Sequence, residues 1–226
     1  MPQNKGFELT PALSIIIAGV IIAAAIIFVR VSPAPTDQAA AAGEKETSVP
    51  APSAQDHVMG SIDAPIVLIE YSDFQCPYCQ VIYPSLKRIV AESNGQVAWI
   101  MREYPLYQIH PQAIPAAYGA ECIAEQQGNE GFWKFADAIF ADQSKLSDGY
   151  YEALAQTLGA DVQSFSECTQ SKKYEQLIQD SIAQAQLSGG NGTPYTIIYN
   201  TKTGKQFAFS GALPEAQIRA LIKAAQ

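Results

Sequence analysis

The chain has 226 residues, with 14 Lys+Arg against 22 Asp+Glu, which gives a formal net charge of −8. Hydrophobic residues make up 48 % and charged residues 16 %, a composition that excludes a disordered tail or a fibrous repeat. The acidity argues against nucleic acid as a partner, because binding it needs a basic surface. Four cysteines and two histidines are too few for a disulfide-packed miniprotein or a histidine-rich metal centre. We therefore expect one folded domain with a different kind of segment in front of it.

An uncharged apolar run spans residues 12–29 and is followed by an arginine. As a helix it would be about 27 Å long, close to the roughly 30 Å hydrocarbon core of a bilayer. We expect residues 12–30 to form an uncleaved transmembrane signal anchor, with residues 1–11 as a short cytoplasmic N-terminus. A cleaved signal peptide and a buried core helix are the alternatives. The nearest small-residue cleavage signal, at residues 40–42, lies well beyond the run.

Residues 31–55 are rich in Ala and Pro and show no apolar period, so we expect a linker there. The remaining residues, 56–226, are enough to enclose one hydrophobic core. Apolar and β-branched runs predict strands, and apolar residues at helical spacing predict helices. In chain order the sequence predicts a strand at 66–69, a helix at 77–93, a strand at 97–101, a purely helical block within 110–189 punctuated by Gly128, Gly149 and Gly159, strands at 195–199 and 206–209, and a helix at 214–225.

Cys76-Pro77-Tyr78-Cys79 stands between the first predicted strand and the first predicted helix. A C-x-x-C alone is compatible with half of a zinc site, a redox pair or coincidence. Structural zinc needs four ligands, and the sequence has no second C-x-x-C or H-x₃₋₅-H, so a redox pair is favoured. Pro77 suits the first helical position, which places Cys76 at the helix N-terminus, where the dipole favours a thiolate. Cys79 lies one turn deeper, so we expect an exposed nucleophile at Cys76 and a protected partner.

Further segments accompany the dithiol along the chain. They are Gly60-x-x-Asp63-Ala64-Pro65-Ile66-Val67-x-x-Glu70-Tyr71-x-Asp73-Phe74, Arg102-x-x-Pro105-Leu106, Ala117-x-x-x-Glu121-Cys122, Phe132-Trp133 and Gly192-Thr193-Pro194. Together with the dithiol they resemble the DsbA-like thiol–disulfide oxidoreductases of the thioredoxin superfamily, over essentially all of residues 56–226. The resemblance implies an α/β thioredoxin fold with an inserted all-helical subdomain at about residues 110–189, here preceded by a transmembrane helix.

The resemblance also implies roles for individual residues. The catalytic residues would be Cys76, Cys79, Glu70 and Pro194. The substrate-binding residues would be Thr193, Pro194, Pro77 and Tyr78. Pro194 would be a cis proline facing the dithiol, and Thr193 would pair with an extended substrate segment. Glu70 would be a buried carboxylate that assists proton transfer at Cys79, whereas the alternative is a solvent-facing residue on an edge strand.

The two remaining cysteines, Cys122 and Cys168, lie in predicted helices without a neighbouring cysteine. In an oxidising compartment they would form a structural disulfide, and the alternative is two separately buried thiols. We expect His57 to be a surface residue and His110 to begin a helix. Neither these residues nor any others predict a metal site.

These features predict a membrane-tethered oxidoreductase, single-pass, with its catalytic domain in the periplasm or outside the cell. It would introduce disulfides into unfolded or reduced exported proteins, and it needs no flavin or metal. By resemblance, a membrane quinone-linked partner, DsbB-like or VKOR-like, would reoxidise it. The Pro-Tyr dipeptide differs from the Pro-His of the best-known DsbA oxidases and matches that of glutaredoxins. A reductase or isomerase therefore stays open, as do a non-catalytic binding module and a copper or zinc carrier.

Overall fold

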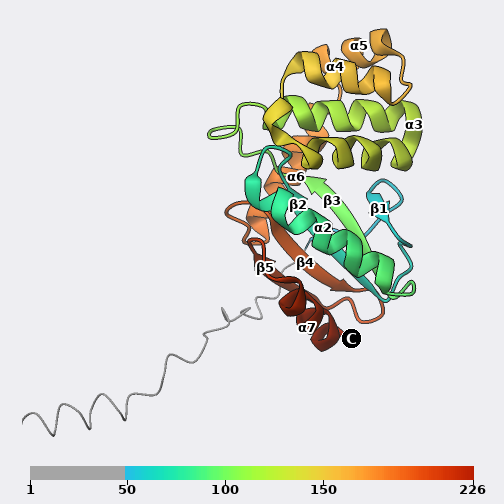
Figure 1. Cartoon of the computed structure of the whole chain (residues 1–226). Coiled ribbons are helices and arrows are strands. Elements are labelled where there is room, and N and C mark those ends of the chain that lie inside the picture. Colours follow the sequence, from blue (N-terminus) through green and yellow to red (C-terminus); the bar gives the residue numbers. More distant parts are fainter. Residues whose placement is uncertain (1–48) are drawn as a thin grey trace, which may run out of the picture. The chain divides into compact units, whose positions relative to one another are not determined.

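A computed structural model describes residues 49–226, in which a mixed five-stranded sheet lies at the centre (Figure 1). The strands are β1 (His57–Met59), β2 (Ile66–Ser72), β3 (Val97–Glu103), β4 (Tyr195–Asn200) and β5 (Gln206–Ser210). Their order across the sheet is β1-β3-β2-β4-β5. Strands β2 and β3 run parallel, and the other neighbouring pairs are antiparallel. The parallel pair needs a crossover connection, and the helix that carries the dithiol supplies it.

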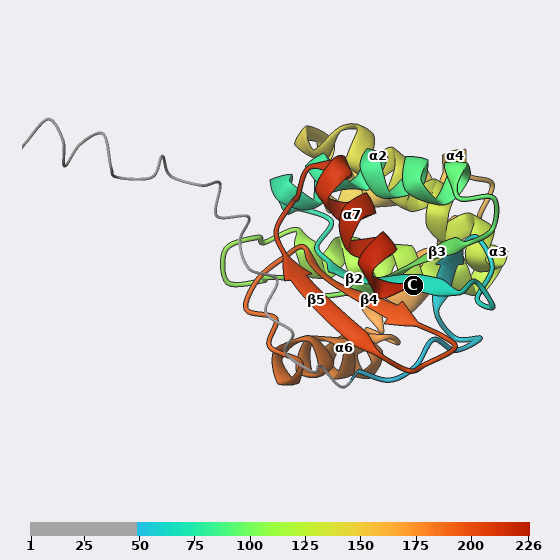
Figure 2. The ribbon, with the colours of Figure 1, turned by 90° about the horizontal axis from the view of Figure 1, so that it is seen from below.

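Helices cover both faces of this sheet. They are α2 (Pro77–Glu92), α3 (Ala113–Ala141), α4 (Asp148–Thr157), α5 (Val162–Gln170), α6 (Glu175–Leu187) and α7 (Glu215–Ala225), with a 3₁₀ turn at Gln143–Lys145. Helices α2 and α7 lie on one face, and α6 lies on the other (Figure 2). Helices α3 to α6 all fall between β3 and β4 in the chain. The predicted sheet with a helical block inserted between two of its strands is confirmed.

All seven residues of β2 are buried, because the strand lies between β3 and β4 and has helices over both faces. Successive side chains of a strand point to opposite faces. Leu68 accordingly packs in the core that α2 and α7 cover, whereas Ile69 packs in the core that α6 covers. Glu70 and Ser72 share the face of Leu68. One carboxyl group and one hydroxyl group are therefore directed into the larger core, beneath the start of α2.

Helix α3 is interrupted at Gly128, whose backbone is non-helical with φ 67°. A residue with a Cβ atom rarely adopts this conformation, so the glycine marks the break that the sequence predicts there. Gly159, with φ +81°, likewise follows the end of α4. Gly149 is different, because it lies inside the first turn of α4, which is capped by Ser147. The helix begins at that cap and not at the glycine.

The short strand β1 is absent from the sequence prediction, and it changes the interpretation of His57. This residue lies in β1 opposite Met101, and its ring stacks on Phe132 at 3.7 Å between centroids. The prediction of a surface histidine is therefore wrong, because β1 places its ring against α3. His110 precedes α3 by three residues and does not begin it.

The predicted anchor, residues 12–30, and the N-terminus before it lie outside the described residues, as does the linker up to residue 48. Within residues 49–226, no helix combines the length and apolar character needed to cross a membrane.

Candidate active site

The dithiol lies where β2 turns into α2. Cys76 is the N-cap of α2, with extended backbone angles, and Pro77 is the first residue of the helix. Its missing N–H group costs nothing at that position, because the first N–H groups of a helix have no partner within it. Cys76 and Cys79 are both free thiols. The local sequence therefore places the Cys76 sulfur at the N-terminal, positive end of α2.

Burial of the two cysteines differs from the prediction of an exposed nucleophile. Cys76 is 3 % exposed and Cys79 is fully buried. The Cys76 thiol donates a hydrogen bond to the Thr193 carbonyl, with 3.4 Å between sulfur and oxygen. The loop before β4 thus covers the first cysteine. Tyr78, between the two, is 64 % exposed and marks where the site opens to solvent.

The environments of the two sulfurs move their pKa values apart. A hydrogen bond from the Cys79 thiol, together with backbone N–H groups at the start of α2, lowers the pKa of Cys76 to about 6. Burial raises the pKa of Cys79 well above its usual value, and the neighbouring Cys76 and Glu70 raise it further. Cys76 is therefore largely a thiolate at neutral pH, and Cys79 keeps its proton.

Glu70 lies in the central strand β2 and is 1 % exposed, so it is not the solvent-facing residue that was the alternative. Ser72 donates a hydrogen bond of 2.9 Å to its Oε1 atom, and Oε2 has no partner among the described residues. Burial raises the pKa of Glu70 to about 8. A carboxyl with this pKa can give or accept a proton near neutral pH. It lies close enough to Cys79 to affect the pKa of that thiol.

The loop opposite the dithiol carries Thr193 and Pro194, and the peptide bond between them is cis. Pro194 is buried, and its carbonyl accepts a hydrogen bond from the Gly211 N–H at 2.8 Å. This bond ties the loop to the end of β5. The structure therefore brings the predicted residues Cys76, Cys79, Glu70, Thr193 and Pro194 to one place, with Pro77 and Tyr78 on the adjoining turn of α2.

Asp73 is a member of the site to which the sequence analysis assigned no role. Its carboxylate is 1 % exposed and accepts hydrogen bonds from the N–H groups of Gln75, at 2.7 Å, and Leu106, at 2.8 Å. It also pairs with His110 Nδ1 at 2.7 Å. An Asp side chain that accepts a hydrogen bond from the N–H two residues later, as Asp73 does from Gln75, forms a local turn. This short-range pattern is one that the sequence alone could indicate. Asp73 thereby fixes the segment before Cys76 to the loop after β3.

Comparisons with known proteins assign this geometry to a family. A family model described as Thioredoxin matches residues 53–224. The chain belongs to the thioredoxin family. Among solved structures, this thioredoxin-family chain is similar to DsbA2 of Pseudomonas aeruginosa, with 26 % identity, a TM-score of 0.64, and coverage of 79 % of this chain and 97 % of that one. A periplasmic thioredoxin-like protein from Salmonella enterica serovar Typhimurium shares the fold, at 23 % identity and TM-score 0.60, covering 75 % and 89 % of the two chains.

Curated relatives of this thioredoxin-family chain are longer proteins with another name. The Na⁺/H⁺ antiporter NhaA 3 of Salinispora tropica is 33 % identical over 155 residues, which are 69 % of this chain and 23 % of the antiporter. The antiporter NhaA 1 of Mycolicibacterium vanbaalenii is 35 % identical over 144 residues, 62 % of this chain and 22 % of that protein. The chain thus spans less than a quarter of the length of these relatives.

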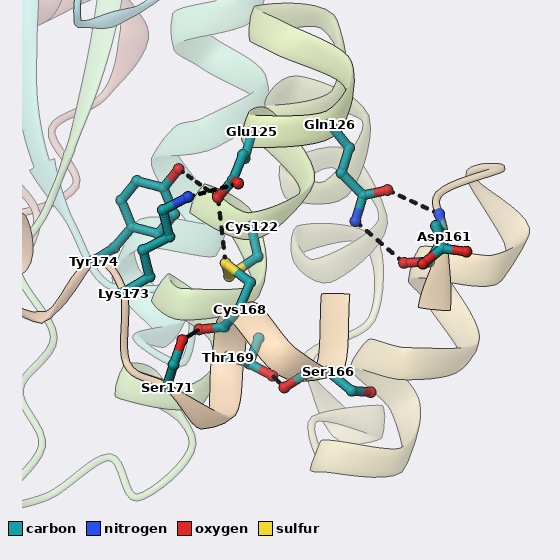
Figure 3. The surroundings of a disulfide bond; sticks show 10 residues. All are labelled: Cys122, Glu125, Gln126, Asp161, Ser166, Cys168, Thr169, Ser171, Lys173 and Tyr174. Carbon is teal, nitrogen blue, oxygen red and sulfur yellow. Dashed lines mark hydrogen bonds and ion pairs between the residues drawn. A yellow bond between two sulfur atoms is a disulfide. The ribbon is translucent and has the colours of Figure 1, made fainter. Parts of the chain in front are cut away.

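A second pair of cysteines lies in the helical part of this thioredoxin-family chain. Cys122 on α3 and Cys168 on α5 are joined by a disulfide, with Cα atoms 5.9 Å apart (Figure 3). Beside it, Glu125 accepts hydrogen bonds from Lys173 at 2.7 Å and from Tyr174 at 2.9 Å. The disulfide therefore ties α5 to α3, and the hydrogen bonds of Glu125 hold the start of α6 beside it. The residues drawn around the disulfide include none of the dithiol site.

Gln143, in the 3₁₀ turn after α3, links the helical part to the dithiol. Its side-chain amide donates to the carbonyls of Phe74, at 2.9 Å, and Cys76, at 3.0 Å. The sequence contains no signal for this contact, because about 70 residues separate the partners. Among residues 49–226, no group of three His, Cys, Asp or Glu side chains is arranged to hold a metal ion.

Proposed function

We propose that this chain is a membrane-tethered thiol–disulfide oxidoreductase that introduces disulfides into exported proteins through Cys76 and Cys79. The observation that carries the proposal is the unequal environment of the two sulfurs. Cys76 has a pKa of about 6 at a helix N-terminus, whereas Cys79 is fully buried with a raised pKa. A reactive sulfur beside a retained partner is what exchange through a mixed disulfide requires.

The reaction starts from the Cys76–Cys79 disulfide. A substrate thiolate attacks Cys76 Sγ, the disulfide breaks, and Cys79 leaves as a thiolate that takes a proton from Glu70. A second substrate thiolate then attacks the substrate sulfur of the mixed disulfide and releases Cys76 as a thiolate. Two electrons pass from the substrate dithiol to the enzyme. The low pKa of Cys76 makes it a good leaving group in this last step.

The substrate would bind along the loop of Thr193 and Pro194. The exposed Tyr78 and Val81, at 64 % and 62 %, form an apolar border at the start of α2. A substrate segment in extended form would pair with the backbone of Thr193 once it displaces the contact with Cys76. This arrangement suits unfolded or reduced chains, because a folded protein rarely offers a free extended segment.

The proposed domain organisation follows the sequence. Residues 1–11 would be cytoplasmic, residues 12–30 the anchor, residues 31–55 the linker and residues 56–226 the catalytic domain, with its helical insertion at about residues 110–189. The domain would face the periplasm or the cell exterior, where disulfides persist. A quinone-linked membrane protein, DsbB-like or VKOR-like, would reoxidise the dithiol.

A reductase or isomerase of the same fold is the second candidate, and one observation favours it. The pKa of Cys76, about 6, is closer to the value of about 7 typical of thioredoxin than to the value of about 3.5 in DsbA. A less stable thiolate means a less oxidising disulfide. The Pro-Tyr dipeptide points in the same direction.

The deciding experiment is the reduction potential of the full-length protein in detergent, measured by equilibration with glutathione. A value near −120 mV supports a disulfide donor, and a value near −250 mV supports the reductase. Labelling cysteines of intact cells or spheroplasts with a membrane-impermeant reagent locates the domain, and the mass of the purified chain shows whether the N-terminal segment is retained. A chain without exchange activity on a reduced model substrate would contradict both candidates.

A further inference from the structure

Glu70 is one of several acidic groups enclosed in the domain. Glu103 at the end of β3 is 3 % exposed, and Glu121 on α3 is 6 % exposed. Acidic side chains are almost never this deeply buried without a partner. Yet Oε1 of Glu103, like Oε2 of Glu70, has no hydrogen-bond partner among the described residues. Such orphan oxygens in a protein interior require an explanation.

Ser72 stands between Glu70 and Glu103. Its hydroxyl donates to Glu70 Oε1 at 2.9 Å, and in the parallel ladder its Cα partner is Glu103. Partners in a ladder present their side chains on the same face of the sheet, so Glu103 lies beside Ser72 in the larger core. Ser72 also lies within hydrogen-bonding reach of Cys79, whose pKa it lowers against the larger effect of burial. Ser72 thus bonds the Glu70 carboxyl, affects the inner thiol and is the neighbour of Glu103 in the ladder.

The far end of this series opens into a cavity. The cavity has a volume of about 410 Å³, and Glu103, Glu121 and His57 all line it. His57 Nε2 lies 3.0 Å from Glu121 Oε2. Neither cysteine of the dithiol nor Thr193 lines this cavity, so it is a separate opening from the one beside Tyr78.

Burial, together with the acidic groups around it, keeps a proton on Glu103. Burial raises its pKa well above the usual value, and Glu121, Asp73 and Glu70 raise it further. The titratable and charged groups that face Glu103 or share its cavity are Glu70, Asp73, Glu121, His57, Arg102, Asp56 and Asp180. Arg102 is paired with Asp56 at 2.7 Å and does not neutralise the carboxyl. Glu103 is therefore a neutral acid that can exchange its proton with Glu70 on one side and with the cavity on the other.

We propose that Glu103 relays protons between Glu70 and the cavity, so that Cys79 exchanges its proton with water on a side of the domain away from the substrate. This inference rests on the proposed function. During reoxidation the Cys79 thiol gives its proton to the Glu70 carboxylate and attacks Cys76 Sγ, so that the Cys76–Cys79 disulfide forms and the sulfur that was bound to Cys76 leaves as a thiolate. Glu70 then passes a proton through the Ser72 hydroxyl to Glu103, which releases one toward the cavity. In the other direction the same series supplies the proton that Cys79 takes up.

The need for this route follows from burial. Cys79 is fully buried and Tyr78 is exposed, so a mixed disulfide on Cys76 would cover the opening beside Tyr78. A proton cannot leave by that opening while the substrate occupies it. The carboxyls supply an alternative path at the moment when Cys79 must lose its proton.

The test uses the reduced full-length protein in detergent and oxidised glutathione. Cys76 attacks glutathione disulfide in a first step, and Cys79 resolves the mixed disulfide in a second. Acid quenching with mass spectrometry follows both steps. We expect Glu103→Gln to slow the second step by about tenfold or more, because direct proton carriers contribute roughly 10²–10⁴-fold. The first step, which needs no proton from Cys79, keeps its wild-type rate.

Three matched variants make the result specific. Glu103→Asp retains an ionisable carboxyl and recovers most of the second-step rate, which a loss of packing alone would not show. Asp180 lines the same cavity but takes no part in the relay, so Asp180→Asn leaves both steps unchanged. Glu121→Gln keeps an oxygen for His57 and slows the second step by about threefold, less than a direct proton carrier would. This last variant decides the question if Glu103→Gln does not fold.

Wild-type resolution rates in Glu103→Gln, or in Glu121→Gln where only that variant folds, would overturn the relay. An equal loss in both steps would also overturn it, because a damaged fold would then explain the defect. If the wild-type protein forms no mixed disulfide at all, the proposed function fails instead, and the two failures are thereby distinguished.

Discussion

The sulfur of Cys76 lies 3.4 Å from the carbonyl oxygen of Thr193, although 117 positions separate the two residues in the sequence. The contact covers the reactive sulfur in the free protein and uses the carbonyl that an extended substrate would need. Substrate binding therefore has to replace this sulfur–oxygen contact with a sulfur–sulfur contact. Attack on Cys76 and pairing with Thr193 become a single event, which explains why a dithiol can be nearly buried and still react.

The two cysteines are expected to differ in what their loss does. Cys76→Ser removes the sulfur that forms the mixed disulfide, so exchange with a reduced peptide substrate should fall to background. Cys79→Ser keeps the attacking sulfur but cannot resolve the intermediate, so mixed disulfides should accumulate. Non-reducing gels with mass spectrometry detect them. Full activity in both variants would contradict the assignment of roles.

Cys79 also controls the acidity of its partner. Its thiol hydrogen bond is the largest cause of the low pKa of Cys76, about 6. Cys79→Ala should therefore raise the pKa of Cys76 toward 9, the ordinary value, whereas Cys79→Ser retains a donor and should raise it less. Thiolate absorbance at 240 nm, followed against pH, measures the shift. An unchanged pKa of Cys76 in the alanine variant would mean that the backbone N–H groups at the start of α2, and not the Cys79 thiol, lower it.

The same pKa fixes how the reduced protein reacts with a small disulfide. The rate should rise about tenfold from pH 5 to pH 7, as the thiolate fraction of Cys76 rises, and then level off. In Cys79→Ala the rise should move to higher pH. A wild-type rate that still climbed steeply above pH 8 would contradict a pKa near 6.

Local signals explain what the sequence could predict. Pro77 after a cysteine and before apolar residues at helical spacing indicates a helix start, and the structure has α2 begin there. The apolar, β-branched run before it is typical of a buried strand, and it predicts β2. Strand β1 has three residues, too few for a periodic pattern, so the sequence predicts neither this strand nor the burial of His57 against α3.

Contacts between distant segments could not be predicted in this way. The cover of Thr193 over Cys76 depends on how β4 pairs with β2, and the amide of Gln143 reaches Cys76 from the end of α3. Neither contact leaves a pattern in the residues around it. The acidic cluster is similar, because Glu103 and Glu121 become neighbours only when α3 packs on the sheet.

The disulfide between Cys122 and Cys168 should affect stability and not chemistry. A Cys122→Ala/Cys168→Ala double variant should lose about 2–4 kcal/mol of unfolding free energy, with a lower Tm. The reduction potential of Cys76 and Cys79 should stay the same, because the bond ties α5 to α3 away from the dithiol. Urea unfolding and glutathione equilibration measure the two quantities. An altered potential with unchanged stability would make this pair functional.

An ionisable carboxyl at Glu70 is expected to serve proton transfer and to lower the stability of the fold at high pH. Its pKa rises from 4.5 to about 8 on folding, so the folded state holds the proton more tightly than the unfolded chain. The stability that this proton provides is complete below pH 4.5 and is lost as pH rises through about 8. Glu70→Gln cannot ionise, so at pH 9 it should be more stable than the wild type, by on the order of 2–4 kcal/mol.

Near pH 5 that difference should largely disappear, because both side chains are then neutral. Over the same range the variant should resolve mixed disulfides about 10²-fold more slowly, since Cys79 has lost the base beside it. Urea unfolding at pH 5, 7 and 9, combined with the two-step glutathione assay, tests both expectations on the same samples. A variant less stable than the wild type at pH 9 would mean that Glu70 is held ionised by a partner, and its role as a proton carrier for Cys79 would be withdrawn.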